Sequence, residues 1–597
     1  MKYKDIIKSV KCKGKTSINL DKIYPIKPIY NSDCSIIYLI DDEPQTIFFD
    51  SYYANKIIIT TKKEVVIDIC LGKGYLTEKA DNWTNLFITD DLWQGGDGIF
   101  SFNIETGEDK FDQENIAKTL FVFGDTFVGN YDRLTEKRYM PQLMPNNTLA
   151  YLENNKVDFR INRGELGQVL AYYNMKEEDK YQGYLPKNLV SYNCLASVKP
   201  YLSSYYPKSL EITFDLSTKR KITHIEIENY FDENSPELSK RGLKEITLFG
   251  SNDNTNWEKI DEFKLRKANK DNLVQTLKIN KTYRHFKILV NPINGLGNYN
   301  DQSFQEGLFG FNKIRFYNEK DYYKDILANA NSILIKEAEH AWIWLQDGVV
   351  IGNNLYFLPL NIASDHTQVE GMQFKVLGVS MFKTPIINQE IVPEKSIQKK
   401  APIFAKFNES TYFYGAGIFA NTIQAKALNP DGYIYIYGYK TTNFLRELIV
   451  SRVKEDRFEY FDDWEYFDGV GYSKNILDSK PLLPHISCEM SVSEILEGRF
   501  KGKYIAVFTY DVNTKYVSFA ISDSLTGPFS KPQKIYITPE QSIFKSTTYT
   551  YNAKAHPNLS KSKRILVSYN TNTYNFDHNM SNRLIYGPRF IYLNEIE

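Results

Sequence analysis

Two linked segments set the pattern of this chain: Gly95-Gly-Asp-Gly-Ile-Phe100 and, after a gap, Thr119-Leu-Phe-Val-Phe-Gly-Asp-Thr-Phe127. A Gly-rich start with a small or acidic residue leads into a run of aromatic and β-branched residues, which is typical of a turn entering a buried strand. Four more pairs of segments keep this order and span Trp344–Leu358, Tyr414–Gly438, His485–Thr509 and Tyr551–Tyr569. Five such starts predict a mainly β fold, a five-bladed β-propeller.

The first strand of each propeller blade lines a central channel, so sequence-distant starts should meet there. We expect this arrangement to bring together Asp97, Asp347, Glu489 and His556. A single Gly-rich start could be a plain turn, but the agreement of five starts favours the propeller.

One long interval interrupts the repeat. Between Asn146 and Trp342 a separate series of strand-like runs occurs, which predicts a jelly-roll β-sandwich inserted between blades. The expected domains are an N-terminal β-rich accessory region (1–80), a first propeller segment (81–160), the insert (185–320) and a second propeller segment (335–597). The stretch 322–339 is the best helix candidate and would serve as a connector.

Composition excludes several classes of function. The 73 Lys and Arg residues balance 73 Asp and Glu residues, so neither nucleic acid nor an anionic membrane is an expected partner. Aromatic residues make up 15% of the chain, with Tyr leading, which suits strands and sugar-stacking surfaces. The chain has no P-loop, H-E-x-x-H or G-x-S-x-G motif, which removes the usual support for nucleotide, zincin and serine-hydrolase chemistry.

Localisation and cofactors are constrained only weakly. The chain has no run of about 20 apolar residues and its first residues lack the apolar core of a signal peptide, so cytoplasmic location is the default expectation and secretion the alternative. Five scattered cysteines without a C-x-x-C pair indicate neither a zinc site nor a disulfide framework. No cofactor is required by these patterns, and the oligomeric state stays open.

The insert resembles the discoidin (coagulation factor 5/8 type C) jelly rolls that serve as carbohydrate-binding modules. The matching stretches are Thr213-Phe-Asp-Leu216, Gly242–Asn254 with Trp257, and Tyr283-Arg-His-Phe-Lys287. The insert lacks the family's disulfide, because Cys194 has no partner near residue 320. We expect Trp257 in the core, with Tyr201, Tyr205 and Tyr206 as candidate ligand contacts. Such modules often hold a structural Ca²⁺, and the loop 291–301 could do so here.

The flanking segments, about 82–153 and 342–597, resemble five-bladed propeller glycoside hydrolases, especially a family with endo-D-arabinanase members. The motifs are Gly-Gly-Asp-Gly (95–98), Phe-Gly-Asp-Thr (123–126), Asn146-Asn-Thr148, Trp344-Leu-Gln-Asp-Gly348, Glu489-Met-Ser-Val492, Ser522–Phe529 and Ala555-His-Pro557. The resemblance implies hydrolysis of a carbohydrate polymer that could contain furanosides.

Glycoside hydrolysis needs two carboxyl groups beside the scissile bond, one as acid and one as base or nucleophile. Asp97 lies between glycines, which leaves its carboxylate uncrowded, although an Asp-Gly pair alone is more often a turn. Asp125 follows an apolar strand, where an unpaired carboxylate would have a raised pKa. The resembled endo-D-arabinanases carry their acidic pair on these two motifs, so Asp97 and Asp125 are the expected catalytic residues, without a choice of which is the acid.

Asp97, Asp347 and Glu489 form a rival catalytic triad. Other five-bladed glycosidases distribute two Asp and one Glu over their blades in this way. Asp347 could equally be a turn residue. Glu489 is flanked by Cys488 and Met490, and an apolar neighbourhood would favour a protonated acid.

Four residues are expected to bind substrate. Trp93 could stack on a sugar ring, His556 could bond a hydroxyl group, and the amides of Asn146 and Asn147 could do the same. Core packing, a backbone-bonded histidine and a plain loop are the respective alternatives. The rival to a glycoside hydrolase is a non-catalytic, lectin-like propeller, which the acidic starts disfavour. A structural propeller for protein partners is weakened by the lack of regular repeats.

Overall fold

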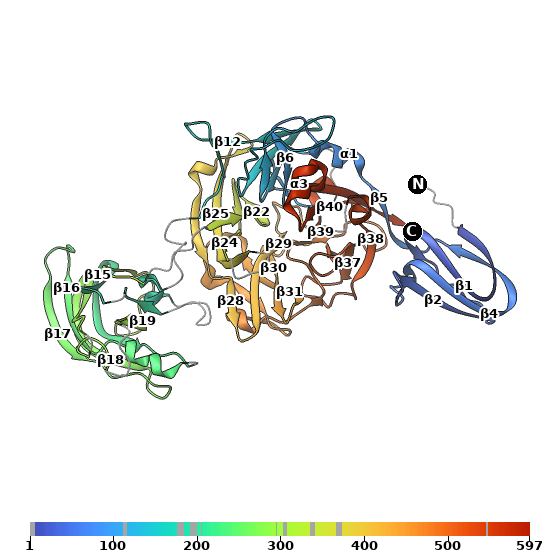
Figure 1. Ribbon diagram of the computed structural model, residues 1–597. Helices are drawn as coiled ribbons and strands as arrows, with labels where there is room; N and C mark the ends of the chain where they lie inside the picture. Colours follow the sequence, from blue (N-terminus) through green and yellow to red (C-terminus); the bar gives the residue numbers. More distant parts are fainter. Residues whose placement is uncertain are drawn as a thin grey trace. The chain divides into compact units, whose positions relative to one another are not determined.

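The computed structural model describes residues 6–111, 116–175, 184–191, 200–204, 206–233, 235–293, 295–301, 307–334, 341–365, 373–544 and 547–596. The chain divides into two compact units, Met1–Met175 with Ala341–Glu597, and Lys176–His340. Strands dominate both units, as expected (Figure 1). The described α-helices are short: α1 (Asp81–Thr84), α2 (Glu540–Ile543) and α3 (Phe576–Ser581).

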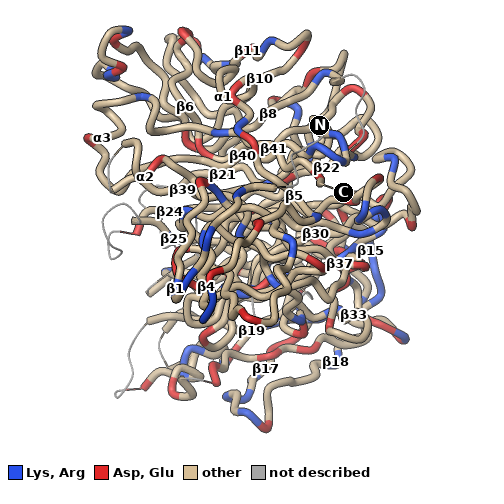
Figure 2. Tube along the Cα trace, turned by 90° about the vertical axis from the view of Figure 1, so that its right-hand side faces the viewer, with Lys and Arg blue, Asp and Glu red and all other residues tan. Residues whose placement is uncertain are grey.

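Figure 2 shows Lys and Arg residues, and Asp and Glu residues, on many separate parts of the drawn trace. Within the described ranges no helix combines the length and the apolar character needed to cross a membrane.

Five antiparallel sheets follow one another along the first unit. The first has the order β11-β10-β8-β7, with β7 (Phe100–Asn103), β8 (Thr119–Phe123), β10 (Thr148–Glu153) and β11 (Lys156–Arg160). The second has the order β21-β24-β25-β23-β22, with β21 (Ala341–Trp344), β22 (Gly348–Ile351), β23 (Asn354–Phe357), β24 (Leu360–Ser364) and β25 (Phe374–Ile387). Strands β26 (Glu390–Ile391) and β27 (Ile397–Ala401) also pair with β25.

The third sheet has the order β28-β29-β30-β31-β32-β33. Its strands are β28 (Phe404–Phe407), β29 (Ser410–Asn421), β30 (Tyr433–Thr442), β31 (Leu445–Lys454), β32 (Glu465–Phe467) and β33 (Tyr472–Ser473), with β34 (Leu483–Pro484) paired to β31. The fourth sheet runs β35 (Met490–Glu494), β36 (Tyr504–Thr509), β37 (Tyr516–Ser522) and β38 (Gln533–Ile537). The fifth runs β39 (Thr548–Ala555), β40 (Arg564–Thr573), β41 (Gly587–Ile596) and β5 (Gly74–Lys79).

One strand from each of the five sheets lies beside the corresponding strand of the next sheet; β22 and β29 are the second strands of their sheets in chain order. Strand β7 contacts β22, β22 contacts β29, β29 contacts β35, and β35 contacts β39. The turn that follows β39, η10 (Pro557–Leu559), returns to β7. The five Gly-rich starts are therefore gathered around one centre, which positions the site described below. A short ladder of β6 (Trp93–Gly96) with β9 (Thr126–Val128) precedes the first sheet, and β12 (Asn162–Arg163) pairs with β13 (Val169–Leu170) after it.

The N-terminal accessory region is shorter than expected. Strands β1 (Ile6–Ile26), β2 (Cys34–Ile40), β3 (Glu43–Pro44) and β4 (Tyr52–Cys70) form their own sheet in the order β1-β4-β2-β3. Strand β5, however, pairs with β41, from Ile591 opposite Lys79 to Ile596 opposite Gly74. The predicted boundary at residue 80 is therefore wrong, because residues 74–79 complete the last sheet of the chain.

The second unit consists of one seven-stranded sheet, whose main path has the order β14-β19-β15-β18-β16-β17 and whose seventh strand, β20, pairs with β15. Its strands are β14 (Tyr201–Leu202), β15 (Leu210–Asn229), β16 (Glu245–Ser251), β17 (Glu258–Lys264), β18 (Val274–Val290), β19 (Gly310–Tyr317) and β20 (Leu327–Ala330). Alternate residues of β15 and β18 enter one core, which includes Phe214, Ile225 and Ile288. The expected helix over 322–339 is wrong where this stretch is described, since β20 pairs with β15 there.

Three aromatic residues of the insert were expected to have particular roles. Trp257 is half-buried with the Lys287 ammonium 4.7 Å from its ring centroid, so it is not the core residue we expected. Tyr201 is fully buried and donates its hydroxyl proton to the Ser332 carbonyl, which excludes it as a ligand contact. Tyr206 is 62% exposed, and Tyr205 lies outside the described residues.

Replacing residues 176–340 by a short glycine–serine linker should leave the first unit folded, because each unit has its own hydrophobic core. We expect one cooperative calorimetric transition with a Tm close to that of the first unit in the full chain. Expression of residues 176–340 alone gives the matched control and should also melt cooperatively. An aggregated first unit would place its boundary elsewhere.

Candidate active site

The Asp97 loop is shaped by the glycines around it. Gly95 has a φ of +125°, and a Cβ there would collide with the Tyr586 carbonyl oxygen; Gly98 has a φ of +56°. These conformations favour glycine, which explains the Gly-Gly-Asp-Gly sequence. The half-buried Asp97 accepts a 2.6 Å hydrogen bond from the Gly98 N–H and a 2.7 Å bond from the Tyr551 hydroxyl.

Asp125 is fastened directly to Asp97 through the backbone. The Asp97 N–H donates to the Asp125 carbonyl at 2.8 Å, and the Gly124 N–H donates to the Asp97 carbonyl at 2.6 Å. The Asn146 amide donates to Oδ1 of Asp125 at 3.0 Å. The two predicted motifs are thus brought together, with Asn146 as the third member.

The two carboxyl groups differ in their surroundings. Burial raises the pKa of Asp125 to about 7, and the neighbouring Asp97 carboxylate adds to this shift against the Asn146 amide and the nearby Trp344 indole. Burial also raises the pKa of Asp97, but Tyr551, Gly98 and the Lys554 charge oppose that shift. Asp97 therefore has the better-stabilised anion of the pair.

A buried ion pair adjoins this loop. Glu489 is 5% exposed and pairs with Lys554, which is 2% exposed. The Asn552 amide donates to Oε1 of Glu489 at 2.9 Å, and the Lys554 ammonium lies 4.0 Å from the Phe100 ring centroid. Burial raises the pKa of Glu489, and Lys554 opposes the shift. A Cβ on Gly98 would be 3.5 Å from Oε1 of Glu489, so the loop glycine also allows this close approach.

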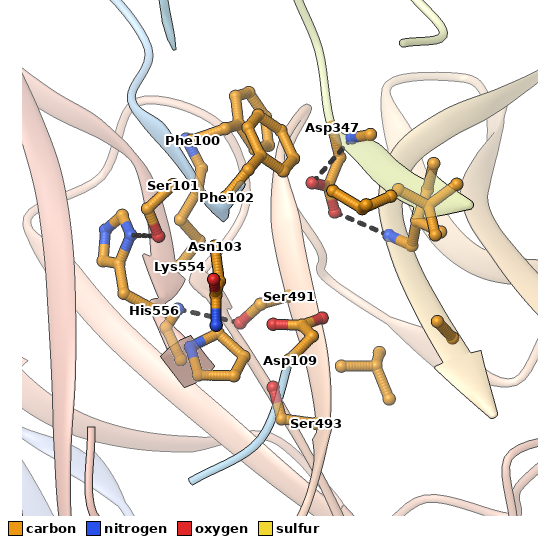
Figure 3. Close-up of a pocket in the computed structure, with 18 of the residues that line it drawn as sticks. Phe100, Ser101, Phe102, Asn103, Asp109, Asp347, Ser491, Ser493, Lys554 and His556 are labelled. Carbon is orange, nitrogen blue, oxygen red and sulfur yellow. Dashed lines mark hydrogen bonds between the residues drawn. The ribbon is translucent and has the colours of Figure 1, made fainter. Parts of the chain in front are cut away.

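Asp347 faces a different space, a small cavity of about 50 Å³ at the centre of the five sheets. The cavity is lined by residues of β7, β22, β29, β35 and β39, Lys554 among them, and by Asp109 from the loop after β7 (Figure 3). Asp347 accepts hydrogen bonds from the Gly348 N–H at 2.8 Å and the Ile418 N–H at 2.6 Å. Burial raises the pKa of Asp347 to about 8, and Asp109 adds to the shift. Of the four predicted carboxylates, Asp97, Asp125 and Glu489 thus cluster, whereas Asp347 lines this cavity.

Three predicted substrate-binding residues are interior residues instead. Trp93 is 1% exposed and stacks on Phe159 with centroids 4.3 Å apart, so no ring face is free for a sugar. The His556 ring bonds Ser101 and Ser568, each at 2.8 Å, and burial lowers the pKa of His556 to about 3. These two expectations are corrected to core packing and a bonded core histidine.

Asn147 is also corrected. It is fully buried, its amide donates to the Tyr173 carbonyl at 2.8 Å, and its Oδ1 accepts the Tyr173 N–H at 2.9 Å. It therefore fastens a loop, whereas its neighbour Asn146 reaches Asp125.

Sequence reasoning missed Lys554, Tyr551 and Trp344 as site residues. Lys554 is a single cation in the otherwise uncharged strand β39, a signal that could have been noticed. Trp344 was quoted only as a member of a motif. It is half-buried, lies 6.1 Å from Trp342 between ring centroids, and neither indole N–H has a hydrogen-bond partner in the described ranges of the chain.

Asp109 gives a testable pH effect. Its carboxyl group accepts no hydrogen bond from the described residues, and burial raises its pKa to about 7. Between pH about 4 and about 7 the folded state holds a proton that the unfolded state has released, so stability falls as pH rises through this window. In Asp109→Asn, which removes this proton, the Tm should fall less than the wild-type Tm between pH 4.5 and 7.5.

The raised pKa values of Asp125 and Asp347 also make stability fall as pH rises. The slope of Tm against pH should therefore be smaller in Asp109→Asn than in wild type, but not zero. The control is Asp523→Asn, whose parent side chain is 84% exposed. Equal slopes for wild type and Asp109→Asn would show that Asp109 titrates normally.

One family model matches part of the chain. Residues 306–595 match the model of a domain of unknown function, DUF5005. No curated protein matches the chain.

Among solved structures, the chain is similar to a candidate hydrolase from Bacteroides ovatus, at 14% identity and a TM-score of 0.45, over 87% of this chain and 90% of that one. It is similar to the GH43_1 enzyme from Xanthomonas citri complexed with xylose, at 13% identity and a TM-score of 0.20, over 43% and 88% of the two chains. Similarity to CBM32-1 from a family 31 glycoside hydrolase of Clostridium perfringens has 16% identity and a TM-score of 0.17, over 24% and 93%. We therefore base the proposed function on the side chains of this chain.

Proposed function

We propose that this protein is a glycoside hydrolase that cleaves a carbohydrate polymer with the Asp97 and Asp125 carboxyl groups. The observation that carries the proposal is the direct fastening of the two motifs, with the Asp97 N–H on the Asp125 carbonyl at 2.8 Å. Two carboxyl groups in one place, each shifted by burial, are what acid–base cleavage of a glycosidic bond requires.

The surroundings of the two residues suggest a division of labour. Asp125, with a pKa of about 7, can hold a proton near neutral pH and donate it to the leaving oxygen. Asp97, whose anion is stabilised by Tyr551 and by the Lys554 charge, suits the base or nucleophile. The Asn146 amide, which donates to Oδ1 of Asp125 at 3.0 Å, would keep that carboxyl group oriented.

The rival triad is less well supported by these contacts. Glu489 forms an ion pair with Lys554 and accepts hydrogen bonds from the Asn552 and Gln346 amides. These contacts stabilise the ionised carboxylate, so they disfavour Glu489 as the proton donor. Asp347 is bonded to two backbone N–H groups at the central cavity. We propose that Glu489 and Lys554 position the Asp97 loop and set its charge balance.

The two units would divide binding and cleavage. We propose that the five sheets are the blades of a five-bladed propeller carrying the active site, and that the insert is a discoidin-like module that holds the polymer and raises its local concentration. No group of three or more His, Cys, Asp and Glu in the described ranges could hold a metal ion. A structural Ca²⁺ held by carbonyl groups of the loop 291–301 stays a proposal.

Reducing-sugar release from a polysaccharide panel tests this function, with arabinans and other furanoside polymers first. We expect cleavage of at least one polymer by wild type and none by Asp97→Asn, with Asp523→Asn as the exposed control. Binding of a polymer without cleavage across the panel would favour the lectin-like alternative.

A further inference from the structure

Arg446 lies beside the segment that carries Glu489. It is near the start of β31, and its carbonyl accepts the Ile486 N–H at 3.3 Å. The next residue of β31, Glu447, pairs with Pro484 of β34. This segment continues to Cys488 and Glu489, so β31 holds the Arg446 backbone beside the stretch that leads into the carboxylate cluster.

The Arg446 guanidinium forms no direct ion pair with a carboxylate of the described residues. No carboxylate in the described ranges of the chain lies within 4.0 Å of it, and its Nε is buried without a hydrogen-bond partner. By contrast, Arg452 on the same strand pairs with Glu465 at 3.2 Å. The groups near Arg446 include the Tyr439 ring, whose centroid is 5.3 Å from the guanidinium carbon, the free Cys488 thiol and the Asp511 carboxylate.

The acidic groups near Arg446 already have partners. Glu489 is paired with Lys554, and Asp511 pairs with His485 at 3.0 Å. Among the described residues Arg446 therefore has no ion-pair partner of its own, and its strand lies beside the segment that leads to Glu489. A guanidinium remains charged at every relevant pH, and its planar fork matches a carboxylate or sulfate.

We infer that Arg446 binds an anionic substituent of the bound sugar, namely the carboxylate of a uronic acid or a sulfate ester. This inference rests on the proposed function for the location of the sugar. It restricts the substrate to an acidic polysaccharide, with the charged unit on the Glu489 side of the cluster. A neutral sugar would leave Arg446 without a counter-charge when water is displaced, which disfavours its binding.

Ligand-observed NMR titration with D-glucuronate, D-glucose 6-sulfate and D-glucose tests the inference. Wild type should bind at least one charged sugar at least tenfold more tightly than glucose at low salt, and added salt should weaken that preference. Arg446→Met should remove the preference, and Arg446→Lys, which keeps the charge without the fork, should retain some of it. Arg457→Met, at an exposed ion pair, is the matched control. Comparison of the two charged sugars distinguishes carboxylate from sulfate.

Equal affinity of wild type for charged and neutral sugars, or a preference retained in Arg446→Met, would overturn the inference. If Arg446→Met does not fold, the Arg446→Lys titration and the salt dependence decide between the same outcomes. A preference that depends on Arg446 in a protein that cleaves no polymer would refute the hydrolase and leave the anion site standing. Cleavage of neutral polymers at rates unaffected by Arg446→Met would support the hydrolase and refute the anion site.

Discussion

Asp125→Asn and Asp97→Asn should each lower kcat by about 10²–10⁴-fold or more while leaving Tm and polymer binding nearly unchanged. Asparagine keeps the size of the side chain and can still bond Asn146 or Tyr551, but it neither exchanges the proton nor carries the charge. The measurements are initial rates of reducing-sugar release and calorimetric binding for both variants, with Asp523→Asn as the control.

The pH profile separates the roles of the two residues. If Asp125 is the acid, with its pKa of about 7, its proton is lost as pH rises, so the rate should fall above pH about 7. Wild-type rates retained by both variants would refute the pair. A rate lost only in Asp347→Asn or Glu489→Gln would move catalysis to the rival triad.

The portion of the site that the sequence predicted lies at the ends of two neighbouring strands. Asp97 precedes β7 and Asp125 follows β8, and because these strands are antiparallel the two residues meet at one edge of the sheet. Because each motif also indicates where its residue lies on the strand, the sequence alone could predict that Asp97 and Asp125 are neighbours.

The sequence near an aromatic residue does not indicate whether another side chain covers the face of its ring. Trp93 and Trp344 both precede an Asp by three or four residues, yet Phe159 covers Trp93, whereas the Trp344 indole lies near Asp125. Phe159 comes from β11, across a separate turn, so periodicity near Trp93 could not reveal this contact.

Pairings over long sequence distances were also missed. Strand β5 pairs with β41 at the other end of the chain. The sequence of β5 alone is compatible with a strand of the N-terminal sheet and with a strand of the last sheet. Lys554 was overlooked because a cation in a strand usually lies on the solvent face. The burial of Lys554 is explained by its ion pair with Glu489, which belongs to another sheet.

Lys554→Met should cost about 3–5 kcal/mol of unfolding free energy, because it leaves the Glu489 carboxylate buried without its counter-charge. Glu489→Gln should also destabilise the protein, by leaving the Lys554 ammonium unpaired. The double variant, Lys554→Met with Glu489→Gln, should lose much less than the sum of the two single losses, since no uncompensated charge remains. Urea unfolding of the four proteins gives this coupling free energy.

The Lys554→Met defect should also depend on pH. Burial already raises the pKa of Glu489, and loss of the Lys554 charge raises it further. At low pH the Glu489 carboxyl group is protonated in the variant and needs no counter-charge, so the defect should shrink as pH falls and grow as pH rises. Lys503→Met, whose parent pairs with the 84% exposed Asp523, is the surface control and should change stability by less than about 1 kcal/mol. Additive single losses, or a defect independent of pH, would mean that Lys554 stabilises the fold through its aliphatic chain against Phe100 and not through Glu489.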